Sequence, residues 1–184
     1  TSRTGQTVMG LGYAVPYLHL FEAKESSVLA FMQARQGVVH WPRGEAARSA
    51  LVDECDLPLI DSVIDVALVI HGLEFAETPQ DMLHEVWRVL SPQGKLIMVV
   101  PNRRSLWAAS ENSPFGDGQP FSRGQIDRLL KQARFMVTRW DTGLHFVPTQ
   151  QRWSLAAAAA LDAVGKYIGS PLSGAIVVEA QKQI

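Results

Sequence analysis

Polar side chains stand directly after two apolar runs of the chain, where an α/β protein places its chemistry. His71 follows the run 64–70, and Asp53 and Glu54 follow the run 49–52. An imidazole can accept a proton near neutral pH, and a carboxylate offers two hydrogen-bond acceptors to a ligand. We therefore interpret His71 as a candidate general base and Asp53, with Glu54, as a candidate ligand-binding pair.

Each of these residues also has a plain structural interpretation. His71 can pack over a bound ligand or close the end of a strand, and Asp53 can be a solvated loop carboxylate. Glu74, which comes three residues after His71, is expected to cap a helix or to face solvent rather than to take part in catalysis. Only the spatial arrangement of these side chains decides between the interpretations.

A second group of polar and aromatic side chains follows the apolar run 95–100. Asn102 closes this run, and Arg103 and Trp107 come next. The Asn102 amide could orient a substrate, although a Pro-Asn turn explains it equally well. An arginine beside an aromatic ring suits an anionic substrate, whereas a solvated charged face is the simpler interpretation. Asn102, Arg103 and Trp107 are therefore candidate substrate-binding residues.

The composition and the spacing of ligand-forming residues disfavour several other kinds of site. His40, His71 and His145 lack the spacing of a metal-ligand set, and the single cysteine, Cys55, excludes a Cys-based zinc site or a disulfide within the chain. A formal net charge of −1 gives no basic surface for nucleic acid or an anionic membrane. The longest apolar run, 155–161, is far shorter than the ~20 residues of a membrane span. We expect no metal, no nucleic-acid partner and no membrane partner, and, because no signal-peptide pattern is present, a cytoplasmic location.

Apolar runs and helical patterns alternate along the chain. Runs typical of buried strands cover residues 7–12, 26–32, 49–52, 64–70, 95–100, 135–140 and 174–180. Helical patterns cover residues 14–23, 79–90, 122–133 and 154–168, and residues 112–120 form a loop. Thr78 is placed to cap the second helix, with Pro79 at its first position and 91–94 after its end, and Ser122 with Gln125 forms a capping box. This alternation predicts a single α/β domain, 1–184, with a Rossmann-like, doubly wound parallel sheet and helices on both faces.

The succession of motifs between residues 57 and 102 resembles the type-11 branch of the class I S-adenosylmethionine (SAM)-dependent methyltransferases. The motifs are Leu-Pro-Leu-Ile-Asp at 57–61, His-Gly-Leu-Glu at 71–74, Glu-Val-Trp-Arg-Val-Leu-Ser-Pro-Gln-Gly at 85–94 and Val-Pro-Asn at 100–102. The resemblance implies a sheet of about seven strands, mostly parallel, whose last strand at 174–180 is antiparallel. It implies SAM as the cofactor and methyl transfer to an unidentified small molecule as the activity.

The first cofactor loop implied by the resemblance departs from the family pattern. In the family, an acidic residue is followed by Gly-x-Gly-x-Gly. Here Gly10 stands at the position of the acid. Of the three loop glycines only the first is present, as Gly12, and Ala14 and Pro16 stand at the positions of the second and third. Because glycine lets the backbone approach a ligand closely, this loop is the weakest part of the match.

The other two cofactor positions lie after the second and third predicted strands. In the family the second strand ends in an acid that accepts both ribose hydroxyls; here it ends in Met32, and Gln33 is a weaker polar substitute. The third position is kept, since Asp53 and Glu54 stand where the family contacts the adenine amino group. The candidate cofactor-binding residues are Gly10, Gly12, Met32, Gln33, Asp53, Glu54 and His71.

The departures leave two functions of different classes. The first is a SAM-dependent methyltransferase acting on a small molecule. The alternative is a non-catalytic methyltransferase-like protein that binds a protein partner or another ligand in the same cleft, with aromatics such as Trp41 and Trp107 at an interface. A nicotinamide-dependent oxidoreductase fits poorly, because it requires Gly-x-Gly-x-x-Gly and an acid after the second strand.

The sequence begins almost directly at its first predicted strand, whereas family members usually carry a helical segment before it. Either this protein has no such segment or the given sequence lacks it, and we expect the cleft to be covered by the missing residues or by the partner in a homodimer. The stretches 36–42 and 101–107 resemble bacterial proteins described only as methyltransferases.

Overall fold

A computed structural model describes residues 5–22, 26–102, 121–143 and 174–183 of the 184-residue chain. The predicted loop at 112–120 and the predicted helix at 154–168 lie outside the described residues. Within the described ranges, none of the helices has the length and apolar character needed to cross a membrane.

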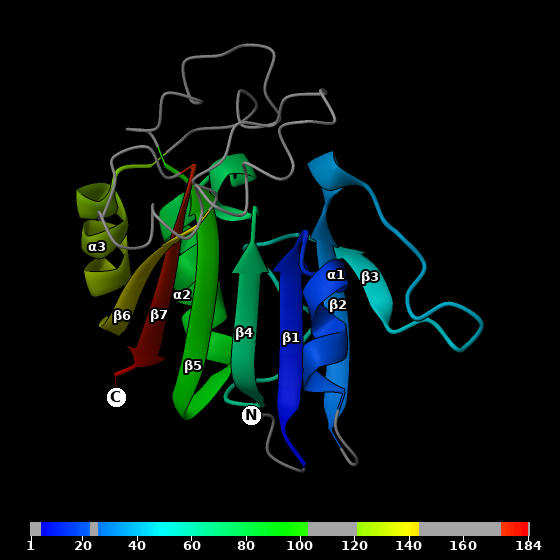
Figure 1. Cartoon of the computed structure of the whole chain (residues 1–184). Helices are drawn as coiled ribbons and strands as arrows, with labels where there is room; N and C mark the ends of the chain where they lie inside the picture. Colours follow the sequence, from blue (N-terminus) through cyan, green and yellow to red (C-terminus); the bar gives the residue numbers. More distant parts are fainter. Residues whose placement is uncertain (1–4, 23–25, 103–120, 144–173, 184) are drawn as a thin grey trace, which may run out of the picture.

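A seven-stranded sheet of order β3-β2-β1-β4-β5-β7-β6 forms the centre of the described part of the molecule (Figure 1). The strands are β1 Thr7–Gly12, β2 Ser27–Gln33, β3 Ser49–Val52, β4 Ile64–Ile70, β5 Leu90–Pro101, β6 Phe135–Gly143 and β7 Ala175–Lys182. The pairs from β3 to β5 are parallel, and β7 is antiparallel to both β5 and β6. This confirms the predicted sheet of about seven mostly parallel strands with an antiparallel last strand.

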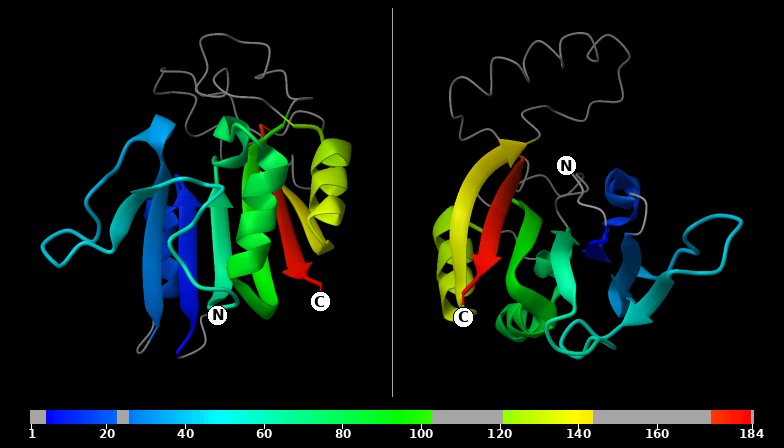
Figure 2. Two further views of the ribbon diagram at one scale, coloured as in Figure 1. Left: turned by 180° about the vertical axis from the view of Figure 1, so that it is seen from behind. Right: turned by 90° about the horizontal axis from the view of Figure 1, so that it is seen from below.

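Helices cover both faces of the sheet, as predicted (Figure 2). The short helix α1, Val15–Leu18, continues as the 3-10 helix η1, His19–Phe21, and packs on one face through Ala14 and Leu18. The helices α2, Pro79–Val89, and α3, Arg123–Gln132, pack on the other face. Single 3-10 turns, η2 Ala34–Gln36 and η3 Leu73–Phe75, follow β2 and β4. The second face carries the larger core.

The amphipathic pattern of α2 explains its place against the sheet. Met82, Val86 and Val89 recur at helical spacing and are fully buried. Pro79 stands in the first turn and Thr78 at the N-cap position, both as predicted, but the Thr78 side chain makes no capping hydrogen bond. The Thr78 hydroxyl instead lies 3.2 Å from the thiol of Cys55, so it ties the helix to the segment that follows β3.

Two other local predictions have different outcomes. The capping box of α3 is confirmed, because the Ser122 hydroxyl accepts from the Gln125 amide at 3.3 Å and the Gln125 side chain accepts from the Ser122 amide at 2.9 Å. The helix predicted over 14–23 is shorter than expected: only one α-helical turn forms before η1. Leu18 is the one buried residue within α1, so little tertiary packing supports further turns.

A charged network fixes the connection between β3 and β4 onto α2. The Glu85 carboxylate accepts from the Leu57 amide at 2.8 Å and from Arg88 Nη2 at 2.6 Å. Arg88 Nη1 also donates to Asp61 at 2.6 Å. The hydrogen bond from Arg88 lowers the pKa of Glu85 despite its burial, and the two carboxylates raise the pKa of Arg88. The connection anchored in this way begins with Asp53 and so positions one side of the candidate site.

Candidate functional site

The carboxyl ends of the parallel strands meet at one edge of the sheet, uppermost in Figure 1. The strand order reverses between β1 and β4, which pair directly. In open α/β sheets a ligand lies outside the carboxyl ends at such a reversal. The candidate residues Gly12, Gln33, Asp53, His71 and Asn102 all end or directly follow strands at this edge.

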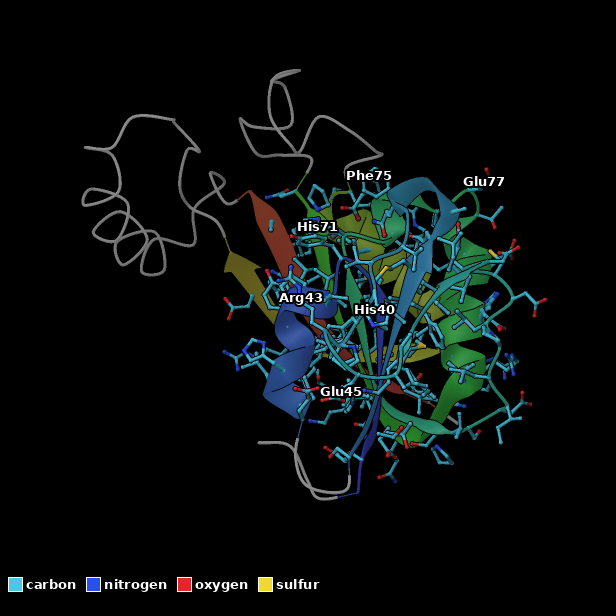
Figure 3. All side chains as sticks on the ribbon, turned by 90° about the vertical axis from the view of Figure 1, so that its right-hand side faces the viewer. His40, Arg43, Glu45, His71, Phe75 and Glu77 are labelled. Carbon is cyan, nitrogen blue, oxygen red and sulfur yellow. The ribbon has the colours of Figure 1, made fainter. Side chains whose placement is uncertain are left out.

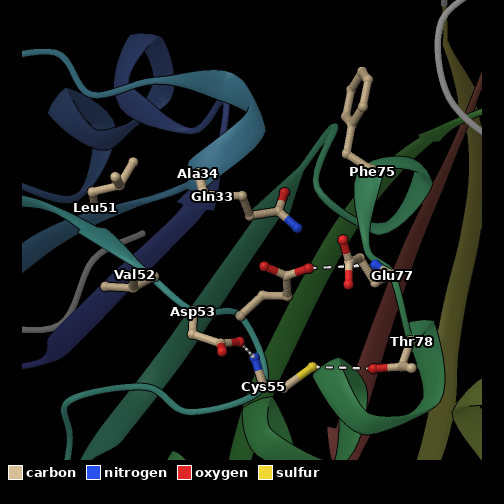
Figure 4. A pocket seen from close by; sticks show the side chains of 10 residues that line it. Gln33, Ala34, Leu51, Val52, Asp53, Cys55, Phe75, Glu77 and Thr78 are labelled. Atoms are coloured by element: carbon tan, nitrogen blue, oxygen red, sulfur yellow. Dashed lines mark hydrogen bonds between the residues drawn. The ribbon is translucent and has the colours of Figure 1, made fainter.

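A pocket of about 640 Å³ opens beside this edge, between the ends of β2 and β3 and the start of α2 (Figure 4). It is lined by Gln33, Ala34, Leu51, Val52, Asp53, Glu54, Cys55, Phe75, Glu77 and Thr78. Three candidate cofactor residues, Gln33, Asp53 and Glu54, therefore share one pocket. The side chain of Gln33 points into it from β2 (Figure 4).

Gln33 is the most unusual residue of the pocket. Its side chain is buried, with 2 % of the residue exposed, yet neither Nε2 nor Oε1 has a hydrogen-bond partner in the described part of the chain. A buried polar atom left without a partner costs about 1–3 kcal/mol. Such a cost persists at sites where a ligand supplies the missing partners. Gln33 thus marks a position for a polar ligand group.

The facing wall of the pocket comes from the segment after β3. Asp53 Oδ1 accepts from the Cys55 amide at 2.9 Å, and Glu54 Oε1 accepts from the Glu77 amide at 3.4 Å. Burial raises the pKa of the Cys55 thiol, and the neighbouring carboxylates add to this effect. The lining residues include three carboxylates and no Lys, Arg or His. This charge pattern favours neutral or cationic ligand groups over phosphates.

Met32 points away from the pocket because neighbouring residues of a strand face opposite sides of a sheet. Its side chain packs in the cluster beneath α1, and its sulfur accepts from the Val39 amide at 3.1 Å. Strand β2 runs one residue further than predicted, to Gln33. The strand-end position that faces the pocket therefore belongs to Gln33.

The two glycines of the β1 turn serve the backbone and the packing of α1. Gly12 has φ +81°, and a Cβ there would lie 2.5 Å from the Ile70 carbonyl oxygen. A Cβ on Gly10 would lie 2.7 Å from that of Ala14 and 3.0 Å from a methyl of Leu18. An acidic side chain therefore has no room at position 10, and neither glycine lines the pocket.

His71 sits in a sharp turn directly after β4. Its backbone has φ +50°, its amide donates to the Val99 carbonyl at 3.0 Å, and its carbonyl accepts from the Gln36 side chain. Its Nδ1 lies 2.7 Å from Oε1 of Glu74, whose side chain is 1 % exposed. The expected cap or solvent role of Glu74 is thus wrong. The only sequence signal for this contact is the three-residue spacing.

Asn102 and His40 do not line the pocket. Asn102 is half-buried, and its backbone N–H donates to the Gly174 carbonyl at 3.0 Å. Arg103, Trp107 and His145 lie outside the described residues. His40 is exposed on the loop between β2 and β3 (Figure 3), where its Nε2 lies 3.2 Å from the Glu45 carbonyl oxygen. The described residues contain no group of three His, Cys, Asp or Glu side chains that could hold a metal ion.

Comparison with known proteins agrees with this architecture. Residues 9–98 match the model of a family described as a methyltransferase domain. No curated protein matches the chain at a significant level.

Solved structures share the fold at low sequence identity. A chain of the Haloferax volcanii complex between the Trm112 methyltransferase activator and a protein assigned as a methyltransferase is 18 % identical, with a TM-score of 0.68 over 100 % of this chain and 85 % of that chain. A Thermotoga maritima SAM-dependent methyltransferase, described as a possible histamine N-methyltransferase, is 19 % identical, with a TM-score of 0.67 over 98 % of this chain and 84 % of that chain. The (4+2)-cyclase SpnF is 21 % identical, with a TM-score of 0.60 over 98 % of this chain and 76 % of that chain.

Proposed function

We propose that the protein is a class I SAM-dependent methyltransferase that transfers the methyl group of SAM to a small molecule. The match of residues 9–98 to the model of a methyltransferase domain and the fold shared with SAM-dependent methyltransferases support this proposal. SAM supplies a methyl group on a positively charged sulfonium sulfur, which leaves as a neutral thioether. The protein must hold the cofactor, align the acceptor and exclude competing reactions.

The observation that carries the proposal is the buried, unpartnered amide of Gln33. A carboxamide offers an acceptor oxygen and two N–H donors. It can therefore accept from one hydroxyl of a ribose and donate to the other, where an acid would accept from both. Glutamine at this position fits a nucleoside cofactor, with a different hydrogen-bond pattern from that of an acid.

The facing wall supports the same placement. The Oδ1 atom of Asp53 is used by the Cys55 amide, and the carboxylate retains acceptor capacity for an exocyclic amine such as that of adenine. Phe75 and Leu51 add apolar lining. The three carboxylates of the pocket disfavour phosphate-bearing nucleotides and are compatible with SAM, which carries no phosphate.

Calorimetric titration of the full chain with SAM tests the proposal. We expect the wild type to bind and Gln33→Leu to bind at least about tenfold more weakly, because the lost hydrogen bonds are worth about 1.4 kcal/mol or more. The same substitution should stabilise the ligand-free protein by about 1 kcal/mol in urea unfolding, since it removes buried amide atoms without partners. Gln33→Glu should retain binding, because it restores the acid.

Gln132→Leu is the matched control, because Gln132 is exposed on α3 far from the pocket. It should leave SAM binding unchanged. Absence of heat with the folded wild type at saturating SAM, or equal SAM affinities for wild type and Gln33→Leu, would refute the assignment of the pocket.

A second function, binding without methyl transfer, rests on two of the structural relatives. One of them is part of a complex with a protein activator, so a protein of this fold can bind a protein partner. Another is a cyclase, so the shared fold does not dictate methyl transfer. Exposed apolar side chains such as Tyr13, Val38 and Val39 are available to a partner on the α1 side of the sheet. If SAM fails to bind the folded wild type, this function becomes the better one.

A further inference from the structure

The outer strand β6 and the helix α3 border a second pocket, at the opposite end of the sheet from the pocket between β2, β3 and α2. This second pocket has a volume of about 610 Å³ and shares no lining residue with the first. It is lined by residues 135–140 of β6, by Arg123, Asp127 and Lys131 of α3, and by Gln183. The three α3 residues recur at four-residue spacing, so they belong to one face of the helix. We call this pocket the β6 groove.

The β6 groove follows the edge of the sheet and not one of its faces. Neighbouring side chains of a strand point to opposite faces, yet every residue from 135 to 140 lines the groove. Among the described strands β6 is the last in the sheet order and pairs only with β7 (Figure 2). The backbone groups on its outer edge therefore have no partner strand in the described part of the chain. An edge of this kind can accept a further strand.

A β-bulge shapes this edge. The register with β7 shifts between Val137 and Arg139, so Thr138 has no register partner on β7. The extra residue brings Trp140 to the same face as Val137, and both side chains pack against the larger core. The guanidinium of Arg123 lies 4.6 Å from the centre of the Trp140 ring. The groove thus contains an aromatic ring with a stacked arginine, and tryptophan and arginine are enriched among the residues that dominate binding at protein interfaces.

The side chains of the groove carry a positive charge in a chain whose formal net charge is −1. The lining cations are Arg123, Lys131 and Arg139, and the one lining acid is Asp127. Lys131 lies 2.7 Å from Asp127, and Arg139 lies 3.5 Å from Asp141, but both pairs are exposed. Because solvent screens exposed pairs, a ligand carboxylate can compete for these cations. Two copies of β6 placed side by side would bring like charges together, so the charge favours an acidic partner over a second copy.

We propose that the β6 groove binds an extended, acidic segment of a partner protein, which adds to the sheet as a strand beside β6. Backbone hydrogen bonds to the outer edge supply affinity, and carboxylates of the segment contact Arg139 and Lys131. An apolar residue of the segment covers Met136, which is 47 % exposed. The bulge and the charge of Arg139 protect the edge from unspecific pairing, so the partner must supply the opposite charge. This binding goes beyond the proposed function and does not depend on SAM.

An acetylated peptide of alternating glutamate and valine residues, as long as β6, is the probe. In two-dimensional NMR of the ¹⁵N-labelled full chain, it should shift the amide signals of residues 135–140, with a Kd on the order of 1 mM or tighter. The amide signals of β3, the outer strand at the other end of the sheet, should stay in place. A lysine–valine peptide, and the glutamate–valine peptide with all backbone amides N-methylated, should each bind at least about tenfold more weakly.

Charge reversal at Arg139 tests the chemistry of the partner. Arg139→Glu should weaken binding of the glutamate–valine peptide at least about fivefold and should strengthen binding of the lysine–valine peptide. The variant is expected to fold, because 72 % of the Arg139 side chain is exposed. Arg128→Glu is the matched control, since Arg128 is exposed on α3 but does not line the groove. It should change either affinity less than about twofold.

The outcomes are decisive in both directions. The proposal is overturned by unmoved amide signals at residues 135–140, by equal binding of the N-methylated peptide, or by equal effects of the two arginine substitutions. Tighter binding of an oligothymidylate of matched charge at the same amides would also overturn it and would assign the surface to nucleic acid. Saturating SAM should leave the peptide affinities unchanged, so failure of SAM binding and failure of strand addition are separate results.

Discussion

The sheet edge formed by the carboxyl ends of the parallel strands has two sides, which differ in whether their polar groups have partners within the protein. At the turn after β1, glycine replaces the acid of the family pattern, and α1 packs directly on it through Ala14 and Leu18. At the ends of β2 and β3, a buried amide and three carboxylates line an open pocket. The first side is closed by its own packing, and the second leaves polar groups for a ligand.

This difference suggests how a degenerate motif can coexist with a usable site. Losing the acid at Gly10 removes a charge that the close approach of α1 could not accommodate. Ligand binding would then depend more heavily on Gln33 and on the wall that begins with Asp53. Three experiments test whether the two sides of the edge differ in this way.

Gly10→Asp should have the largest effect, because it tests whether the β1 side is closed. The new side chain would meet Ala14 at 2.7 Å and place a carboxylate in the core beneath α1. We expect a loss of more than about 3 kcal/mol in the free energy of unfolding, measured by urea titration.

The same substitution at Gly124 is the control. A Cβ at Gly124 meets nothing within 4 Å, and the residue lies in the first turn of α3, where a negative charge is favourable. Gly124→Asp should change stability by less than about 0.5 kcal/mol. A stable Gly10→Asp variant that binds SAM more tightly than wild type would show that the β1 side is open.

Glu85→Gln should have an intermediate effect, because Glu85 holds Leu57 in the connection whose first residues form the open wall. We expect a loss of about 1–2 kcal/mol at pH 7, since the charge-assisted hydrogen bonds to Arg88 weaken. The pKa of Glu85 is lowered in the folded protein from an ordinary value of 4.5, so its contribution is present above that pH and is lost as pH falls further.

Urea unfolding of wild type and Glu85→Gln at pH 7 and at decreasing pH below 4.5 measures this difference. The difference in the free energy of unfolding between wild type and Glu85→Gln should become smaller as the pH falls. Asp127→Asn, which weakens only the exposed pair with Lys131, should cost less than about 0.5 kcal/mol at pH 7. If this difference in unfolding free energy stays constant or increases in acid, the ionised Glu85 carboxylate does not stabilise the fold as proposed.

Alkylation of Cys55 should show the smallest effect and reports on the open wall directly. Because burial raises the pKa of this thiol, iodoacetamide at pH 8 should modify it a few-fold more slowly than free cysteine. Saturating SAM should slow the reaction further, since Cys55 lines the pocket. Mass spectrometry reads a single site, because the chain has one cysteine. Equal rates with and without SAM would place the cofactor elsewhere.

Much of the architecture was determined by the sequence alone. Continuous apolar runs such as 64–70 predicted the buried parallel strands, and the alternation of strands and helices predicted the doubly wound sheet. The motif block from 57 to 102 predicted a resemblance to SAM-dependent methyltransferases, and residues 9–98 match the model of a methyltransferase domain. These signals are strong because burial on both faces of a sheet demands long apolar segments at regular spacing.

Only the tertiary structure decided how the polar residues of the site are used. The sequence could not tell whether Met32 or Gln33 faces the ligand, because a shift of one residue in strand register reverses every side chain. It could not show that Gly10 packs against α1, or that Glu74 turns inward to His71. These features depend on contacts between separate elements and on the direction of single side chains, which local patterns of apolar and polar residues do not encode.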